Sequence, residues 1–261
     1  MAEFDTRGAY LKSLALDGDE ILLLSEDGRQ THGGACNLLP YAGRIRNGTY
    51  SFNGIRYSFP TGEDGHSIHG FARDTEFSAA EVSGNSVLFE AFLRNGGYPS
   101  TLLASIKYDL RRRTLSVSYH ARNTGELAAP LVIGSHPYFL TKGKWMVIPE
   151  FQAENLRLAD RYFPDGTFIP FNFDRSLNGL QLDSCFVGGG ALRLRSDYGE
   201  MLISRRNMPY FLLYNGKYTG GRSVAVEPMT GAPDAYNNGI GVVVLEAGEG
   251  YSCGYSVTFR K

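Results

Sequence analysis

Two residue pairs place a titratable side chain directly before a proline: His136-Pro137 and Glu227-Pro228. The proline ring excludes the α region for the preceding residue, so we expect both His136 and Glu227 to be extended. Proline also removes a backbone donor, and we expect each proline to end its strand. A carboxylate and an imidazole held in this way could move protons near neutral pH. Taken singly, each has a structural alternative: an exposed edge residue for Glu227 and a hydrogen-bonded core histidine for His136.

Two further histidines lie in the segment Gly65-His66-Ser67-Ile68-His69-Gly70-Phe71. Their His-x-x-His spacing is one that metal sites use. The segment contains no cysteine and offers no complete ligand set, so we predict no metal site.

Arg44 and Arg46 lie in the segment Pro40-Tyr-Ala-Gly-Arg-Ile-Arg-Asn-Gly48. Residues two apart on an extended chain point to the same side. One guanidinium could therefore donate several hydrogen bonds to a ligand rich in hydroxyls. The alternative is an exposed pair on an edge strand.

The elements that position these residues are predicted to be short strands. In Tyr50–Phe59, alternating apolar residues flank Asn53-Gly54, which predicts a tight hairpin because both turn residues need a positive φ. Residues 115–119 and 251–259 also alternate with period two, and Val224 and Val226 share the face opposite Ala225 and Glu227.

Other segments complete the predicted architecture. The runs Ile21–Leu24, Val87–Phe92 and Val242–Leu245 suit strands buried on both faces, and Arg111–Arg113 suits a solvated hairpin tip. The best helical candidate is short and lies near Tyr98–Leu103. We therefore predict an all-β protein whose residues 1–261 form a single domain, a large antiparallel β-sandwich.

Composition narrows the class of protein. The 261 residues include 26 basic and 27 acidic side chains, a balance that predicts neither nucleic acid nor an anionic membrane as a partner. Three widely spaced cysteines indicate neither a disulfide scaffold nor a zinc site. The first residues do not resemble a signal peptide, and no apolar run is long enough for a membrane span. We expect a cytoplasmic protein, a monomer or a homodimer, with a small molecule as its partner.

Four segments in order resemble the aldose 1-epimerase (galactose mutarotase) family. They are PYAGRIRNGTYSFNGIRY, HSIHGFARD, GSHPYF and VAVEPMTGAPDAYN, and the resemblance extends from about Asn37 to the C-terminal strands. The family's fold is a large antiparallel β-supersandwich, in agreement with the predicted strands. The resemblance implies conversion between the α and β anomers of a free aldose such as glucose or galactose, without a cofactor.

The resemblance also implies a role for each matched residue. Glu227 matches the family's catalytic base and His136 its catalytic acid. His69 and Arg44 match residues that bind the sugar, and Asp183, within a short motif, matches an aspartate that holds sugar hydroxyls. In this mechanism Glu227 takes the proton of O1 while His136 donates one to O5, so a neighbouring carboxylate should raise the pKa of His136.

Several positions depart from the family pattern or have no assigned role. The family often has Asn at Gly43 and Gln at Met229, positions that could affect which hydroxyls are recognised. His32 and His66 receive no role, and His120 is expected to be structural. Phe71, Tyr138 and Phe139 are expected to line the cleft.

Three alternatives remain open. A mutarotase for a phosphorylated sugar would need a basic pocket, for which Arg46, Arg73, Arg205 and Arg206 are the candidates. A carbohydrate-binding β-sandwich without catalysis would need no acid–base pair. A glycoside hydrolase would need two carboxylates about 5–10 Å apart, and the sequence offers only Glu227 and Asp183.

Overall fold

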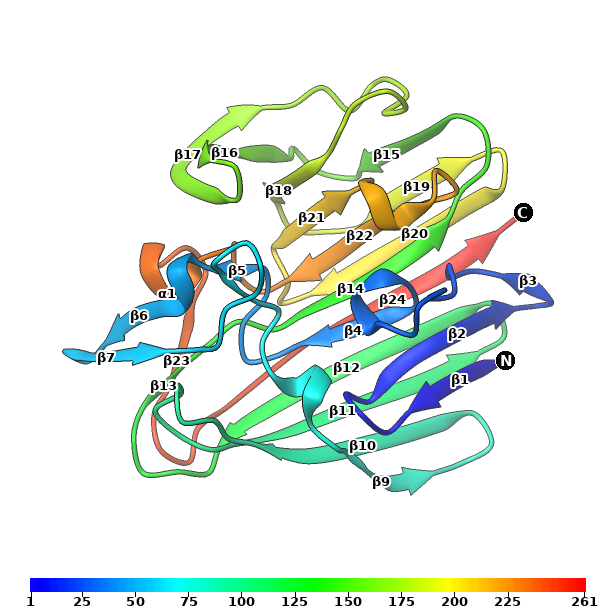
Figure 1. Ribbon diagram of the computed structural model, residues 1–261. Coiled ribbons are helices and arrows are strands. Elements are labelled where there is room, and N and C mark those ends of the chain that lie inside the picture. Colours follow the sequence, from blue (N-terminus) through cyan, green and yellow to red (C-terminus); the bar gives the residue numbers. More distant parts are fainter.

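Two large antiparallel sheets form the body of the protein. The computed structural model describes residues 1–261, and Figure 1 shows one sheet in front of the other. A single cluster of 61 buried hydrophobic residues fills the space around and between the sheets. The prediction of an all-β antiparallel supersandwich is confirmed.

The first sheet carries the candidate site. Its strands, in order from one edge, are β1 (Ala2–Asp5), β2 (Tyr10–Leu16), β4 (Ala35–Leu38), β14 (Gly134–Leu140), β22 (Ser223–Met229), β21 (Tyr210–Tyr214), β18 (Asp183–Val187), β16 (Glu154–Asp160) and β17 (Phe163–Pro170), with the short β3 (Asp19–Glu20) paired to β2.

The second sheet closes the other side of the core. Its order is β15 (Trp145–Pro149), β19 (Leu192–Ser196), β20 (Gly199–Arg206), β24 (Gly250–Arg260), β12 (Thr114–Asn123), β11 (Leu102–Arg111), β10 (Ser86–Leu93) and β9 (Ser78–Val82). The alternation predicted for residues 115–119 and 251–259 is present, because alternate side chains of β12 and β24 are buried in the core.

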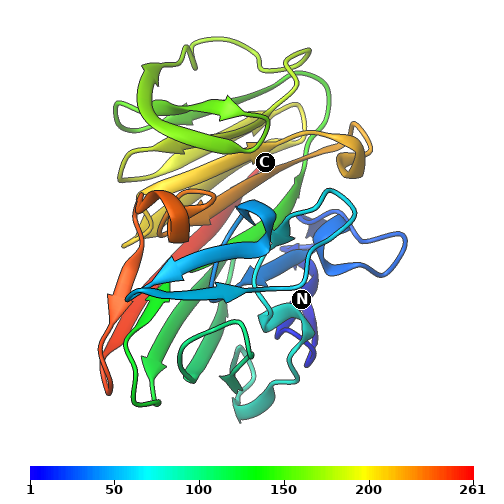
Figure 2. The same ribbon diagram turned by 60° about the vertical axis from the view of Figure 1, so that its left-hand side comes forward.

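Smaller elements lie outside the two large sheets, several of them grouped at one side of the molecule (Figure 2). They are the strand pairs β5 (Arg44–Ile45) with β8 (Ser67–Ile68), β6 (Thr49–Phe52) with β7 (Ile55–Ser58), and β13 (Ala129–Leu131) with β23 (Val243–Leu245). The helices are η1 (Gln30–His32), η2 (Arg46–Gly48), η3 (Ala72–Asp74), η4 (Lys217–Thr219) and α1 (Ala235–Asn238). None of these helices has the length and apolar character that crossing a bilayer requires.

The predicted hairpins are confirmed. Asn53 and Gly54 have φ values of 49° and 77° in the turn between β6 and β7, as this type of turn requires. The arginine triplet forms the tip between β11 and β12, where Arg112 has a φ of 51°.

Three predictions about local structure are wrong. No helix forms near Tyr98: this segment is a turn that leads into β11, and Pro99 disfavours the α region at Tyr98. Residues 21–24 make only an isolated bridge, from Leu22 to Phe139. The runs in β10 and β23 are strands but are not buried on both faces, because Phe92 and Val244 are exposed on the outer sides of their sheets.

The two X-Pro prolines do not end their strands, which corrects the prediction made from them. Pro137 lies within β14 and Pro228 within β22. These neighbouring strands pair at Gly134–Met229 and again from Tyr138–Ala225, with no pairs between. The prolines therefore interrupt the ladder between two central strands while both strands continue.

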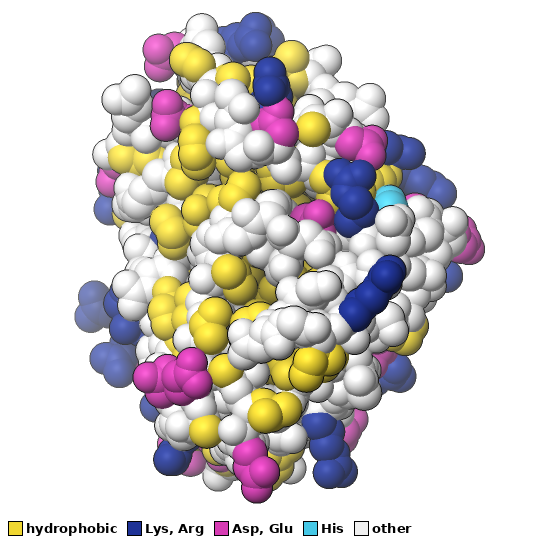
Figure 3. All heavy atoms as spheres, turned by 90° about the vertical axis from the view of Figure 1, so that its left-hand side faces the viewer, with side chains coloured by type: hydrophobic (Ala, Val, Ile, Leu, Met, Phe, Trp, Pro, Cys, Tyr) yellow, Lys and Arg dark blue, Asp and Glu magenta, His cyan; other side chains and the backbone are white.

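The face of the molecule with α1, β6 and β7 shows how charge is distributed. Figure 3 shows apolar side chains gathered along the middle of this face, with acidic and basic side chains scattered toward its margins. Neither sign of charge forms a continuous field there, as expected from the even balance of the whole chain.

Buried polar side chains join the two sheets. The Asn37 amide on β4 donates to the carbonyls of Gly8 and Ala9, at 3.0 and 2.9 Å, and its oxygen accepts from the Tyr119 hydroxyl on β12 at 2.8 Å. The Tyr108 hydroxyl on β11 lies within 3.2 Å of the same amide. Asn37 is fully buried, so its hydrogen bonds fix how β4 sits on the second sheet.

Replacing Asn37 by alanine is expected to lower the free energy of unfolding by about 2–5 kcal/mol, because several buried groups lose their partners. The measurement is urea denaturation followed by fluorescence. Asn85→Ala, at the exposed turn between β9 and β10, is the matched control and should change stability by about 0.5 kcal/mol or less. Equal effects of the two substitutions would show that the Asn37 network does not stabilise the sandwich.

Candidate active site

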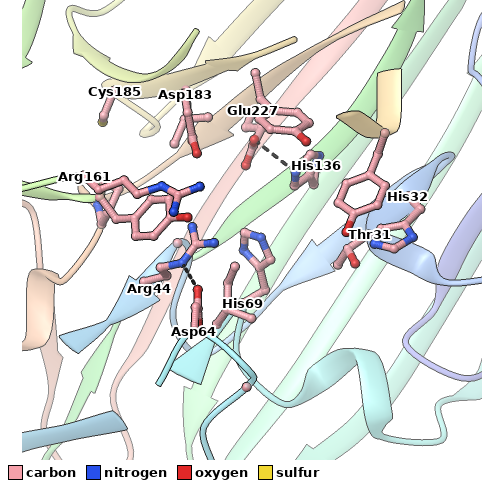
Figure 4. Close-up of a pocket in the computed structure, with 18 of the residues that line it drawn as sticks. Thr31, His32, Arg44, Asp64, His69, His136, Arg161, Asp183, Cys185 and Glu227 are labelled. Atoms are coloured by element: carbon pink, nitrogen blue, oxygen red, sulfur yellow. Dashed lines mark hydrogen bonds and ion pairs between the residues drawn. The ribbon is translucent and has the colours of Figure 1, made fainter. Parts of the chain in front are cut away.

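The five residues predicted for the site line a single pocket of about 590 Å³ on the outer face of the first sheet. Figure 4 shows them pointing toward one another from separate elements: Asp183 from β18, Glu227 from β22, His136 from β14, Arg44 from β5 and His69 from the turn after β8. Five side chains that lie far apart in the sequence, from Arg44 to Glu227, thus face the same pocket.

His136 and Glu227 form the centre of the pocket. The register of β14 against β22 puts them opposite each other, in the gap that the prolines leave in the ladder. Nε2 of His136 lies 3.2 Å from Oε1 of Glu227. Their side chains are only 7% and 2% exposed, so this contact is shielded from bulk water. Nδ1 of His136 and Oε2 of Glu227 have no hydrogen-bond partner within the protein.

Burial controls the protonation of this pair. It lowers the pKa of the His136 imidazole to about 3 and raises the pKa of the Glu227 carboxyl well above its ordinary value, with the Asp183 charge adding to the second shift. The expectation that a neighbouring carboxylate raises the pKa of His136 is wrong in net direction, because loss of hydration outweighs attraction. Both shifts favour the uncharged form of each group, a protonated carboxyl beside a neutral imidazole.

Aromatic rings fix the orientation of His136. Its ring stacks on Tyr138, with centroids 4.6 Å apart, and meets the edge of Tyr214 at 6.2 Å. The Tyr138 hydroxyl donates to the carbonyl of Thr31 at 2.7 Å. The imidazole is thus held between rings that are themselves tied to neighbouring elements.

His69 lies in a strained backbone conformation. Its φ is 64°, unusual for a residue other than glycine, and Gly70 follows with a φ of 67°. A Cβ at Gly70 would lie 1.9 Å from the carbonyl oxygen of Leu39, so only glycine fits there. This turn brings the His69 ring edge-on to His136, with centroids 5.4 Å apart, and leaves its buried Nδ1 without a protein partner. Strain of this kind is concentrated at functional sites.

Arg44 and Asp183 supply polar groups on the side of the pocket beyond Glu227. Nε of Arg44 donates to Asp64 at 2.8 Å, and its guanidinium lies 3.5 Å from the centre of the Tyr162 ring. Burial raises the pKa of Asp183, and the charges of Arg44 and Arg161 oppose that shift. A guanidinium and a carboxyl so placed can bind neighbouring hydroxyls as donor and acceptor.

Other expectations about the cleft have mixed outcomes. Tyr138 lines the pocket as expected, whereas Phe139, the next residue, points into the core, and Phe71 packs against Phe59 and Tyr98. Successive residues of a strand face opposite sides, so Tyr138 and Phe139 could not both line the pocket.

Of the four arginines considered for a phosphate, only Arg73 lines the pocket. Arg46 contacts Asp160 at 3.2 Å and lies over Phe163. Arg205 donates to backbone carbonyls, including that of Met208, and belongs with Arg206 to β20 of the second sheet.

The remaining histidines are also placed. His66 accepts a hydrogen bond from the backbone of Asn47 at 3.1 Å, and His120 on β12 contacts Ser252 at 2.9 Å. His32, which had no predicted role, lines the pocket. No group of three or more His, Cys, Asp or Glu side chains is arranged to hold a metal ion.

Several pocket residues carry no sequence signal that would have identified them. They belong to loops and short helices from distant segments, and they include Arg29, Thr31, Glu63, Asp64, Arg161, Tyr162 and Tyr218. Only the assembled fold shows that they face the same space as His136.

The fold and the pocket define an antiparallel β-supersandwich with a buried imidazole–carboxyl pair on the outer face of one sheet. A family model described as aldose 1-epimerase matches residues 1–258. This chain belongs to the aldose 1-epimerase family.

Known relatives agree with this assignment. The uncharacterized protein YihR of Escherichia coli K12 is 28% identical over 270 residues, covering 94% of this chain and 85% of that protein. Human galactose mutarotase is 30% identical over 148 residues, or 54% of this chain and 42% of that protein. A crystal structure of a galactose mutarotase-like protein from Lactobacillus casei superposes with a TM-score of 0.84 at 20% identity, covering 99% and 96% of the two chains, which shows the likeness of fold.

Replacing Glu227 by glutamine is expected to change how stability depends on pH. A carboxyl with a raised folded pKa stabilises the protein at low pH, and that contribution is lost as pH rises above the ordinary value of 4.5 toward the folded pKa. The unfolding free energy of Glu227→Gln minus that of wild type should therefore increase by about 1.4 kcal/mol per pH unit over this range.

The measurement is urea denaturation of both proteins at several pH values from about 5 to 8. Glu81→Gln on β9 is the exposed control, and its difference from wild type should stay constant. A constant difference for Glu227→Gln as well would mean that the folded protein keeps this carboxyl ionised near neutral pH.

Proposed function

We propose that this protein is an aldose 1-epimerase that interconverts the α and β anomers of an aldose by acid–base opening and closure of the sugar ring. The observation that carries the proposal is the 3.2 Å contact between the buried His136 imidazole and the Glu227 carboxyl within one polar pocket. The pocket, at about 590 Å³, is within the range of about 300–1,000 Å³ typical of small-molecule sites.

Two coordinated proton transfers suffice for the reaction. The Glu227 carboxylate takes the proton of the anomeric hydroxyl O1, and Nε2–H of His136 gives its proton to the ring oxygen O5. The C1–O5 bond breaks as C1=O1 forms, the C1–C2 bond rotates, and the reverse transfers close the ring on the other face. Each positioned transfer typically contributes about 10²–10⁴ in rate.

The exchange needs one proton on the pair, and the sugar returns it on ring closure. A hydroxyl that donates to Glu227 stabilises the carboxylate and so favours the proton on His136. Oε2 of Glu227, buried without a protein partner, is an acceptor available for that hydroxyl.

The other pocket residues hold the ring in register with the pair. In this proposal Arg44, His69 and Asp183 bind the remaining hydroxyls. Alignment is important here because a displaced ring misaligns both transfers at once.

Glu227→Gln and His136→Asn are each expected to lower catalysed mutarotation by about 10²–10⁴, because each removes one proton transfer while keeping the shape of the side chain. Polarimetry of freshly dissolved α-glucose and α-galactose measures the rate. The matched controls are Glu81→Gln and His120→Asn, both exposed and remote from the pocket.

Full activity of folded Glu227→Gln would contradict the assignment of the base. A change confined to KM in His136→Asn would make His136 a binding residue. Sugar binding without any interconversion by the wild-type protein would instead identify a carbohydrate-binding protein.

A further inference from the structure

The guanidinium of Arg44 is held by two contacts that come from different parts of the chain. Its Nε donates to Oδ2 of Asp64 at 2.8 Å. The ring of Tyr162 covers one face of the group, with Cζ of Arg44 3.5 Å from the ring centroid. Asp64 precedes β8, whereas Tyr162 lies between β16 and β17. Segments far apart in the sequence therefore fix the guanidinium at one edge and on one face.

These contacts leave the two outer nitrogens of Arg44 available. Nε is the one nitrogen of this guanidinium that hydrogen-bonds to the protein, so Nη1 and Nη2 keep their N–H donors for a ligand. Figure 4 shows the guanidinium with Asp64 on one side and Asp183 and Glu227 on the other. The charge of Arg44 opposes the rise that burial causes in the pKa of Glu227, as expected for a cation that faces this carboxyl.

Asp64 is itself fixed by a tight turn. The backbone N–H of His66 donates to its second carboxylate oxygen, Oδ1, at 3.1 Å. The N–H of Gly62 donates to the carbonyl of His66 at 2.8 Å and closes the turn. The strand that follows, β8, pairs with β5 so that Ile68 is opposite Arg44. The carboxylate that contacts Arg44 is thus attached to the strand beside it.

The tip of the hairpin formed by β16 and β17 is docked in the same way. Phe163, next to Tyr162, is only 2% exposed, and Cζ of Arg46 lies 4.0 Å from the centroid of its ring. Arg46 also contacts Asp160, at the end of β16, at 3.2 Å. These contacts hold the hairpin tip against the segment of β5 and η2, and so keep the Tyr162 ring over Arg44.

Such an arrangement affects the free energy of ligand binding. A long arginine side chain loses rotamer freedom when it binds a ligand, and this loss weakens binding. A side chain that is already ordered in the free protein loses less. Pairing through Nε alone suits this effect, because a bidentate pair through Nη1 and Nη2 would occupy the donors that a sugar needs.

We propose that Asp64 and Tyr162 are positioning residues for Arg44, which hold its Nη1 and Nη2 toward the sugar hydroxyls before the sugar binds. The inference rests on the proposed function, because that function assigns Arg44 to substrate binding. Each of the two residues acts through Arg44 and not through the reacting atoms.

The first test measures turnover of glucose and galactose by NMR exchange between the anomers. Asp64→Asn and Tyr162→Leu should each lower kcat/KM about 3- to 10-fold, mainly by raising KM, because the substrate must then order Arg44. Tyr162→Phe keeps the ring and should recover most of the loss. The matched control is Asp109→Asn on β11, which removes an equivalent 2.8 Å contact with Nε of Arg111 and should leave kcat/KM unchanged.

A double-mutant cycle separates positioning from a general structural effect. In a protein that carries Arg44→Gln, adding Asp64→Asn or Tyr162→Leu should change kcat/KM by less than about twofold, because no guanidinium remains to be positioned. Equal losses with and without Arg44 would overturn the inference. Wild-type kcat/KM in both Asp64→Asn and Tyr162→Leu would overturn it as well.

The positioning of Arg44 can also be measured without turnover. The Nε–H signal of Arg44 in the NMR spectrum of the free protein is assigned by its absence in Arg44→Gln. In Asp64→Asn this proton should exchange with water about tenfold faster, since a neutral acceptor replaces a charged one. An unchanged exchange rate would show that Asp64 does not hold the guanidinium.

The results distinguish failure of the inference from failure of the proposed function. If the wild-type protein converts neither sugar, the proposed function fails. Calorimetric dissociation constants for glucose and galactose then replace kcat/KM in the same double-mutant cycle. If the wild-type protein neither converts nor binds these sugars, the inference fails together with the proposed function.

Discussion

The candidate site depends on an interruption of backbone pairing between two central strands. β14 and β22 are both interior strands of the first sheet, so β4 and β21 hold their outer sides. Where Pro137 and Pro228 lie, the ladder between the two strands is absent, and it resumes at Tyr138–Ala225. A proline in an interior strand normally weakens a sheet. Here the unbroken partners on either side keep the strands extended, and the residue before each proline projects from the same face.

Polar side chains on the core side of the first sheet, opposite the pocket, have hydrogen-bond partners. Ser135, next to His136 but on the core side, contacts the Tyr255 hydroxyl of the second sheet at 2.9 Å. Asn37, its neighbour in register on β4, makes the hydrogen bonds that join the sheets. On the pocket side of the sheet, hydrogen bonding is incomplete: Glu227, His136 and His69 each bury a polar atom without a protein partner. A well-satisfied network on one side of the sheet therefore supports an under-satisfied one on the other, an arrangement typical of sites prepared for a ligand.

Sequence reasoning was most successful where a local rule sets the geometry. The Asn53-Gly54 turn and the alternation along β12 and β24 follow from single-residue conformations and from burial on one face. The extended conformation of His136 also follows from a local rule, but the effect of its proline on the sheet does not, because that depends on which strands flank it. The prediction that Phe139 lines the cleft failed for a similar reason: the aromatic character of a residue does not determine on which face of its strand the side chain lies. The approach of Arg161 and Tyr162 to Asp183 depends on how the loop between β16 and β17 returns over the sheet, and no sequence spacing encodes it.

The order of elements across the first sheet has a consequence for how the molecule becomes functional. Strands from the first forty residues and from residues beyond 220 lie side by side around β14. Pairing between strands so far apart in the sequence is slow to form, since a long loop must close before pairing gives any gain. During synthesis, an N-terminal fragment that ends before β22 holds the imidazole but not the carboxylate. The imidazole and the carboxyl therefore come together only when β22, in the last fifth of the polypeptide, joins β14, so the proposed sugar turnover would report correct assembly of the first sheet.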